Sequence, residues 1–177
     1  MRILLSVLLI VALTVSIGAA QSQVKKETVE GINNFAKIES TVACAGAITP
    51  ASVAGIKKMG YAAIINLREA TEQNANVEAE AAAAKTAGIN YVHVPFNGQQ
   101  PSTAAVDQFL KAITTPGNTP AFIHCAGGNR AAAMWFIKRA VVDKWTIDQA
   151  MAEATDLGFT SQALKTFATD YVKAHQK

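Results

Sequence analysis

The sequence alternates short apolar runs with longer stretches in which apolar residues recur every three or four positions. The short runs predict β-strands, at residues 35–38, 42–44, 62–67, 91–94 and 120–124. The periodic stretches predict helices, at residues 49–60, 75–87, 102–113, 131–142, 146–157 and from 161 toward the C-terminus. Strands separated by helical stretches indicate a single-domain α/β fold, with a mostly parallel central sheet and helices on both faces.

Several helices also carry recognisable boundary signals. Thr146 and Gln149 match the capping-box pattern, in which two side chains satisfy the first free N–H groups of a helix. Ser161 is a second expected N-cap. The stretch 131–142 is apolar nearly all round, which predicts a buried helix with Trp135 and Phe136 in the core.

The first 20 residues differ in composition from the rest of the chain. Fifteen of them are apolar, Arg2 gives a positive start, and small residues precede Gln21. This pattern predicts an export signal over residues 1–20, and therefore a periplasmic or secreted protein. The alternative is a membrane anchor over residues 3–20. We expect a polar lead at 21–34 to follow, and then one domain at 35–177.

Composition and charge narrow the class of partner. Without its first 20 residues the 177-residue chain has 157 residues, with 15 Lys and Arg against 13 Asp and Glu. Basic residues form only short pairs and no stripe, which argues against nucleic-acid binding. After signal cleavage no membrane contact is expected, because no second long apolar run exists. No oligomeric signal is visible.

The predicted strand-to-helix turn at residues 124–131 carries the most distinctive chemistry. In open parallel sheets ligands bind outside the carboxyl ends of the strands. Two adjacent glycines allow the backbone N–H groups to surround an anion, and the following helix adds the partial positive charge of its N-terminus. Arg130 offers a planar fork for two oxyanion oxygens, and this field favours the thiolate form of Cys125. The turn therefore predicts a nucleophile directed at a bound oxyanion.

A plain structural interpretation of the same turn is also open. Cys125 would be a small apolar residue at a strand end, Gly127 and Gly128 an ordinary turn, and Arg130 a surface charge.

This turn resembles the signature loop of the cysteine-dependent protein-tyrosine and dual-specificity phosphatases, in which His-Cys is followed by a glycine-containing turn and Arg. The segments 60–68 (GYAAIINLR) and 87–95 (AGINYVHVP) are similar to two further strands of that superfamily. The resemblance covers roughly residues 36–160. It is closest to the bacterial phosphatase-like domain of beta-lactamase-hydrolase-like proteins and NAD-kinase fusions, and it implies a dual-specificity-phosphatase-like fold.

The resemblance also implies roles for individual residues. Cys125 would be the nucleophile that forms a phosphocysteine, and His124 would orient the loop and help to hold the thiolate. Arg68 would be a possible auxiliary positive group, or else a solvated charge. The phosphate would be bound by the loop residues Ala126, Gly127, Gly128, Asn129 and Arg130.

The chain departs from the superfamily pattern in three places. Four residues separate Cys125 from Arg130 instead of the usual five, and the hydroxyl residue expected after Arg is Ala131. The loop at 96–101 lacks the usual general-acid Asp and has Asn97 instead, a loss of about 10²–10⁴ in rate. Asp107 lies nearby on a predicted helix and is expected to be solvated. We therefore expect weak phosphatase activity.

Two other functions remain open. The short loop is also similar to the active loop of rhodanese sulfurtransferases, which holds a persulfide. A catalytically silent module that binds phosphate or another oxyanion is the third possible function, because the general-acid Asp and the hydroxyl residue after Arg130 are absent.

The expected substrate is a phosphorylated protein or a small phosphoester, and the segments 69–75 and 96–103 decide which. No cofactor and no metal is expected, since the histidines and cysteines do not form a zinc pattern. Cys44 is either a core residue or a partner that oxidises with Cys125.

Overall fold

The computed structural model describes residues 24–38 and 41–176 of the chain. The predicted export signal at 1–20, like the alternative membrane anchor at 3–20, lies outside the described residues. Within the described ranges, no helix is both long enough and apolar enough to cross a membrane.

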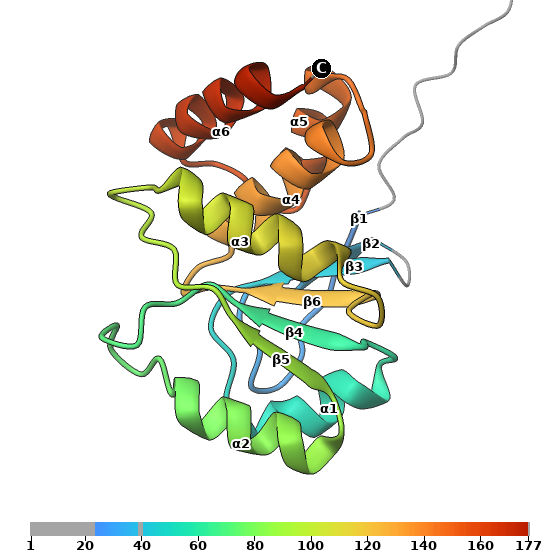
Figure 1. Cartoon of the computed structure of the whole chain (residues 1–177). Coiled ribbons are helices and arrows are strands. Elements are labelled where there is room, and N and C mark those ends of the chain that lie inside the picture. The colour runs from blue at the N-terminus through green and yellow to red at the C-terminus, as the bar shows by residue number, and fades with distance from the viewer. Residues whose placement is uncertain (1–23, 39–40, 177) are drawn as a thin grey trace, which may run out of the picture.

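A six-stranded sheet forms the centre of the molecule (Figure 1). Its strands are β1 (Val24–Lys26), β2 (Ala36–Ile38), β3 (Val42–Ala45), β4 (Ala63–Asn66), β5 (Asn90–His93) and β6 (Ala121–His124). They lie in the order β1-β2-β3-β6-β4-β5. The pairs β3–β6, β6–β4 and β4–β5 are parallel, whereas β1–β2 and β2–β3 are antiparallel. The carboxyl ends of β4, β5 and β6 therefore meet at one edge.

Helices cover the sheet on both faces. Figure 1 shows α3, α4, α5 and α6 on one face and α1 and α2 on the other. Their bounds are α1 (Val53–Lys58, after the short 3-10 helix Pro50–Ser52), α2 (Val77–Ala87), α3 (Thr103–Thr114), α4 (Asn129–Val141), α5 (Ile147–Asp156) and α6 (Gln162–His175). This architecture confirms the predicted fold class.

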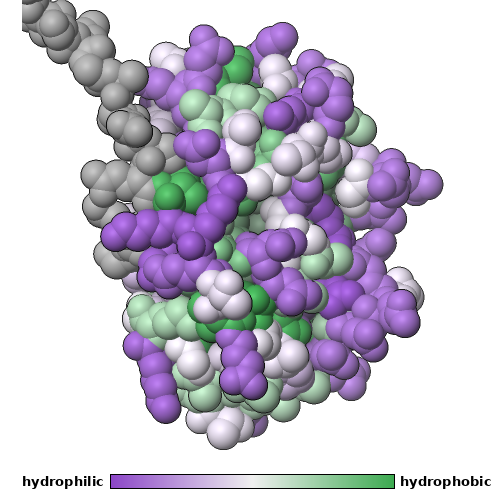
Figure 2. Space-filling view, turned by 180° about the vertical axis from the view of Figure 1, so that it is seen from behind, coloured by the Kyte–Doolittle hydropathy of each residue, from purple (hydrophilic) through white to green (hydrophobic). Residues whose placement is uncertain are grey.

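Two apolar cores lie on the two faces of the sheet. The larger one surrounds α4, whose side chains are buried over most of its length, including Trp135 and Phe136. The smaller one packs α1 and α2 against Phe122 and Ile64. Seen from behind, hydrophilic side chains alternate on the surface with less polar and apolar ones (Figure 2). Burial on both faces accounts for the nearly continuous apolar run of β4.

The predicted elements are found, with ends that differ by at most four residues. The Thr146–Gln149 capping box is present, and the Ser161 side chain accepts a hydrogen bond from Leu164 N. Helix α4 starts at Asn129 rather than at 131, because Gly128 supplies the N-cap. The polar lead contributes a strand that the pattern did not predict: β1 pairs with β2 at the edge of the sheet. Strand β1 has only three residues, which is too short for an alternation of apolar and polar positions to be recognised in the sequence.

Candidate active site

The loop after β6 lies at the carboxyl edge of the sheet, between the ends of β3 and β4. Its first half continues the sheet: Cys125 N donates to Ala45 O at 3.2 Å, and Ala47 N donates to Ala126 O at 2.9 Å. A side chain at Gly46 would meet Ala126 O at 2.9 Å, so this close approach requires glycine. The loop is therefore held against β3 before it enters α4.

Gly128 makes the turn from this loop into α4. Its φ of +98° lies in the left-handed region, which glycine adopts without a steric penalty. In this conformation its N–H donates to the sulfur of Cys125 at 3.0 Å. Cys125 is 1 % exposed, so its sulfur lies in a dry environment with a backbone donor aimed at it.

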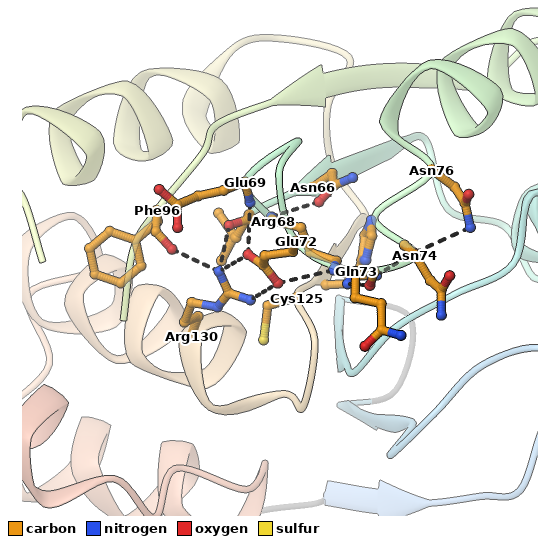
Figure 3. A network of polar contacts seen from close by, with 12 residues as sticks. Asn66, Arg68, Glu69, Glu72, Gln73, Asn74, Asn76, Phe96, Cys125 and Arg130 are labelled. Carbon is orange, nitrogen blue, oxygen red and sulfur yellow. Dashed lines mark hydrogen bonds and ion pairs between the residues drawn. The ribbon is translucent and has the colours of Figure 1, made fainter. Parts of the chain in front are cut away.

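Arg130 extends from the first turn of α4 across the ends of β4 and β5. Its Nη1 donates to Leu67 O at 3.2 Å and to Phe96 O at 2.9 Å. Its Nη1 and Nη2 also donate to the two carboxylate oxygens of Glu72, at 2.6 Å and 2.8 Å (Figure 3). A bidentate pair of this kind fixes the plane of the guanidinium as well as its position.

One edge of this guanidinium makes no hydrogen bond to a nitrogen or oxygen of the described residues, and the Cys125 sulfur lies near the guanidinium. The Nε–H makes no hydrogen bond there, and Nη2 uses only one of its two hydrogens, toward Glu72. These two donors are the fork that matches two oxygens of a tetrahedral oxyanion. Burial lowers the pKa of Arg130, but pairing with Glu72 and the nearby Cys125 outweigh it and raise that pKa.

Glu72 is the carboxylate that orients Arg130, and it was not among the residues predicted to form the site. Burial raises its pKa, but hydrogen bonds from Arg130, from Glu69 N and from Arg68 outweigh burial and lower the pKa to about 2. Glu72 is therefore ionised at neutral pH. It lies in a polar loop without periodicity, and its only sequence signal is the spacing of four residues from Arg68.

Arg68 was predicted either as an auxiliary group at the phosphate or as a solvated charge, and the structure shows a third arrangement. It is 4 % exposed. Its guanidinium donates to Glu72 at 3.2 Å, to Asn74 O at 2.7 Å and to Gln73 O at 2.6 Å. Arg68 therefore shapes the 69–75 loop that presents Glu72.

A cavity of about 430 Å³ opens beside Arg130. Most of the residues that line it are polar, and Leu164 is the one aliphatic side chain among them. The lining residues are Glu69, Glu72, Asn97, Gly98, Gln99, Asn129, Arg130, Ser161 and Leu164.

Asn97 stands where the superfamily pattern has its general acid. Its side-chain amide donates to Glu69 at 2.9 Å, and its Oδ1 accepts from the backbone N–H groups of Gln99 and Gln100. Asp107 is exposed on α3, as expected, and it accepts a hydrogen bond from the Tyr171 hydroxyl at 2.5 Å.

Asn129 joins the loop to the start of α6. Its Oδ1 accepts from the backbone N–H groups of Thr160 and Ser161, at 2.8 Å and 2.7 Å, and its Nδ2 donates to the hydroxyl of Thr160. Its side chain is thus used to brace the loop.

His124 and Cys44 lie close to the nucleophile. His124 is fully buried on the α2 side of the sheet. Cys44, on β3, faces the α4 side, as Cys125 does, and both are free thiols. Burial, with a contribution from the neighbouring Cys125, raises the pKa of the Cys44 thiol, so it remains neutral.

The predicted site residues thus have different surroundings. Gly128 and Arg130 lie near the Cys125 sulfur, whereas Arg68 and Asn129 support the loops around it. The carbonyls of Ala126 and Gly127 accept hydrogen bonds from Ala47 N and Asn34 Nδ2, and His124 is buried on the α2 side. The carboxylate Glu72 completes the arrangement.

Sequence comparisons show which family the chain belongs to. The model of the family described as "DSP-PTPase phosphatase fused to NAD+ Kinase" matches residues 16–172, and the chain belongs to that family. A beta-lactamase hydrolase-like protein of Xylella fastidiosa is 35 % identical over 106 residues, which are 58 % of this chain and 24 % of the relative. The match therefore spans about a quarter of that longer protein. The resemblance seen in the sequence is confirmed.

Solved structures share the fold at low sequence identity. A putative phosphatase from Shewanella putrefaciens has a TM-score of 0.68 at 19 % identity, covering 83 % of this chain and 96 % of its own. The core catalytic domain of a PP-IP phosphatase from S. cerevisiae has a TM-score of 0.65 at 17 % identity, with coverages of 81 % and 88 %. TpbA of P. aeruginosa has a TM-score of 0.63 at 18 % identity, with coverages of 88 % and 91 %.

Proposed function

We propose that this protein hydrolyses phosphate monoesters through a phosphocysteine on Cys125. The observation that carries the proposal is the open Nε–Nη2 edge of Arg130, fixed by Glu72 in the loop that holds the Cys125 sulfur. Membership of the phosphatase family supports it. An arginine whose other donors are already satisfied can bind two phosphate oxygens without rearranging.

The proposed reaction has two displacements at phosphorus. In the first, the thiolate of Cys125 attacks, a P–S bond forms, and the P–O bond to the leaving group breaks. The leaving oxygen takes a proton from solvent. In the second, water attacks the phosphocysteine, the P–S bond breaks, and inorganic phosphate and the thiolate are released. Arg130 and Gly128 N would stabilise the negative charge in both steps.

The carboxyl groups near this site are poorly placed to protonate the leaving group. Glu72 is ionised and paired with two arginines, and Asp107 is bound to Tyr171. Glu69 lines the cavity but is bonded to Asn97. We therefore propose weak activity that favours esters with good leaving groups, since these need no general acid.

The substrate is proposed to be a phosphorylated protein or a small phosphoester. A structure of TpbA with a Cys-to-Ser substitution contains pTyr, and the S. cerevisiae relative is a PP-IP phosphatase. The lining of the cavity in this chain contains no aromatic side chain. This composition favours a small polar leaving group over a tyrosine ring.

Sulfur transfer is a second candidate, favoured by one observation. Only four residues separate Cys125 from Arg130, and in this short loop Cys125 is 1 % exposed. A persulfide occupies less space than a phosphoryl group. In that reaction the Cys125 thiolate would take the outer sulfur of thiosulfate, release sulfite, and then pass that sulfur to cyanide as thiocyanate.

One experiment separates these functions. The full chain and its Cys125→Ser variant are assayed with para-nitrophenyl phosphate and, separately, with thiosulfate and cyanide. We expect phosphate release that falls at least about 10³-fold in the variant. Thiocyanate formation without phosphate release would replace the proposal by sulfur transfer. An oxyanion-induced rise in melting temperature without turnover of either substrate would show a binding module instead.

We also propose that residues 1–20 act as an export signal, which their composition supports. N-terminal sequencing of the protein recovered from its producing cells should begin at Gln21. Recovery of the intact N-terminus in the membrane fraction would instead show an anchor.

A further inference from the structure

A buried acidic residue lies beneath the nucleophile, on the face of the sheet opposite α4. Glu80 of α2 and His124 at the end of β6 are both 0 % exposed. The Oε2 atom of Glu80 accepts hydrogen bonds from Asn66 Nδ2 at 2.8 Å and from the Tyr91 hydroxyl at 3.0 Å. The same oxygen lies 3.2 Å from His124 Nε2.

This cluster is incompletely satisfied. Glu80 Oε1 and both ring nitrogens of His124 have no hydrogen-bond partner among the described residues. A buried carboxylate without a cation and a buried imidazole without a partner are each unfavourable. A proton on His124 Nε2 relieves both, because the 3.2 Å contact then joins an imidazolium to a carboxylate.

We propose that Glu80 is a positioning residue that holds His124 in its protonated form, and that this charge favours the thiolate of the adjacent Cys125. The positive end of the pair is the one closer in the chain to the sulfur, and in a dry interior such a field is weakly screened. The inference rests on the proposed nucleophilic role of Cys125. It applies equally to phosphate transfer and sulfur transfer.

The other groups around this pair are few. Arg130 and the neutral thiol of Cys44 face Cys125 from the α4 side. Asn66 and Tyr91 face Glu80 from β4 and β5. Burial raises the pKa of Tyr91, so it remains a neutral donor. Glu80 is thus the carboxylate that distinguishes the two protonation states of His124.

The test measures the reactivity of the thiol rather than turnover, so it does not depend on the proposed reaction. In a Cys44→Ala background Cys125 is the only thiol, and its rate of alkylation by iodoacetamide is followed against pH. We expect Glu80→Gln to move the midpoint of this profile upward by about 0.5–1 pH unit. Glu78→Gln, an exposed change on the same helix, should leave it in place.

A double-mutant cycle identifies the route of the effect. Once His124 is changed to Asn, Glu80→Gln should produce no further shift. A midpoint that stays in place in a folded Glu80→Gln protein, or a shift that persists without His124, would overturn the proposal.

If Glu80→Gln does not fold, NMR of the ¹⁵N-labelled wild-type protein tests the same claim. The His124 ring should remain protonated at about pH 8, where an ordinary imidazole is neutral. A neutral ring there would also overturn it.

Discussion

Helix α4 has an arginine–carboxylate cluster near each end, and the two clusters differ in what they leave unpaired. Near the C-terminal end, Arg139 uses all three of its nitrogens, toward Glu153 and Asp143, and stacks on Trp135 and Trp145 with its central carbon 4.6 Å and 4.2 Å from the ring centroids. Near the N-terminal end, Arg130 binds Glu72 through Nη1 and Nη2 and leaves Nε without a described partner.

The difference indicates which cluster serves the fold and which serves a ligand. Around Arg139 each of the three nitrogens, Nε included, already donates to a carboxylate, and two indole rings lie against the guanidinium, so a ligand at its Nε edge would have to displace a protein partner. Around Arg130 the carboxylate saturates only the far edge. One helix therefore carries the same ion-pair chemistry for two purposes.

The largest effect is expected for Arg130→Lys. Lysine keeps the charge but cannot present two donors in one plane, so kcat/KM for para-nitrophenyl phosphate should fall about 10²–10³-fold. The unfolding free energy should fall by only about 1 kcal/mol, because Glu72 retains a cationic partner. Steady-state kinetics and urea unfolding measure the two quantities. Full activity in this variant would remove the distinction between the clusters.

Glu72→Gln should lower kcat/KM about 10-fold or more, because the guanidinium loses its fixed plane. Gln73→Ala is the control in the same loop, since the Gln73 side chain is exposed and only its backbone carbonyl takes part in the network. An equal loss in both variants would contradict the assigned role of Glu72.

Glu72 also predicts a dependence of stability on pH. Its pKa of about 2 in the folded protein lies below the ordinary 4.5, so its stabilising contribution is complete above about pH 4.5. That contribution is lost as the pH falls toward 2. The difference in unfolding free energy between wild type and Glu72→Gln should therefore shrink over this range. Urea titrations at several pH values measure it.

Arg139→Lys should show the opposite balance from Arg130→Lys. It removes the stacking on two rings and the paired hydrogen bonds to Glu153, so the unfolding free energy should fall by about 2 kcal/mol. Activity measured below the melting transition should change by less than about 2-fold. A selective loss of activity would mean that the two ends of α4 are coupled.

The smallest effect is expected away from both clusters. Thr146→Ala removes the hydroxyl that accepts from Gln149 N at 3.3 Å, and it should cost about 1 kcal/mol without changing kcat/KM. Thermal unfolding and the phosphatase assay together provide this baseline for the variants above.

Much of the fold and part of the candidate site could be predicted from the sequence. Apolar periodicity located the elements from β2 to α6, because burial on one or two faces imposes a period, and the Thr146 cap followed from its local pattern. The nucleophile loop was found because its residues are contiguous. Arg68 was predicted as a possible auxiliary group at the phosphate or as a solvated charge, whereas its guanidinium binds the carbonyls of Gln73 and Asn74.

Glu72 and Glu80 were missed for a related reason. Each is brought to its partner by the fold across a long separation in sequence: Glu72 lies 58 residues from Arg130, and Glu80 lies on an alanine-rich helix far from His124. Neither a period nor a motif marks such a residue. Only the path of the chain shows which carboxylate meets which cation.

A crystal structure with bound sulfate or tungstate tests the central claim most directly. The account predicts an anion held by Nε and Nη2 of Arg130 and by loop N–H groups beside Cys125, with the Arg130–Glu72 pair intact. An anion that displaces Glu72 from Arg130, or a loop that remains empty at saturating anion, would contradict it.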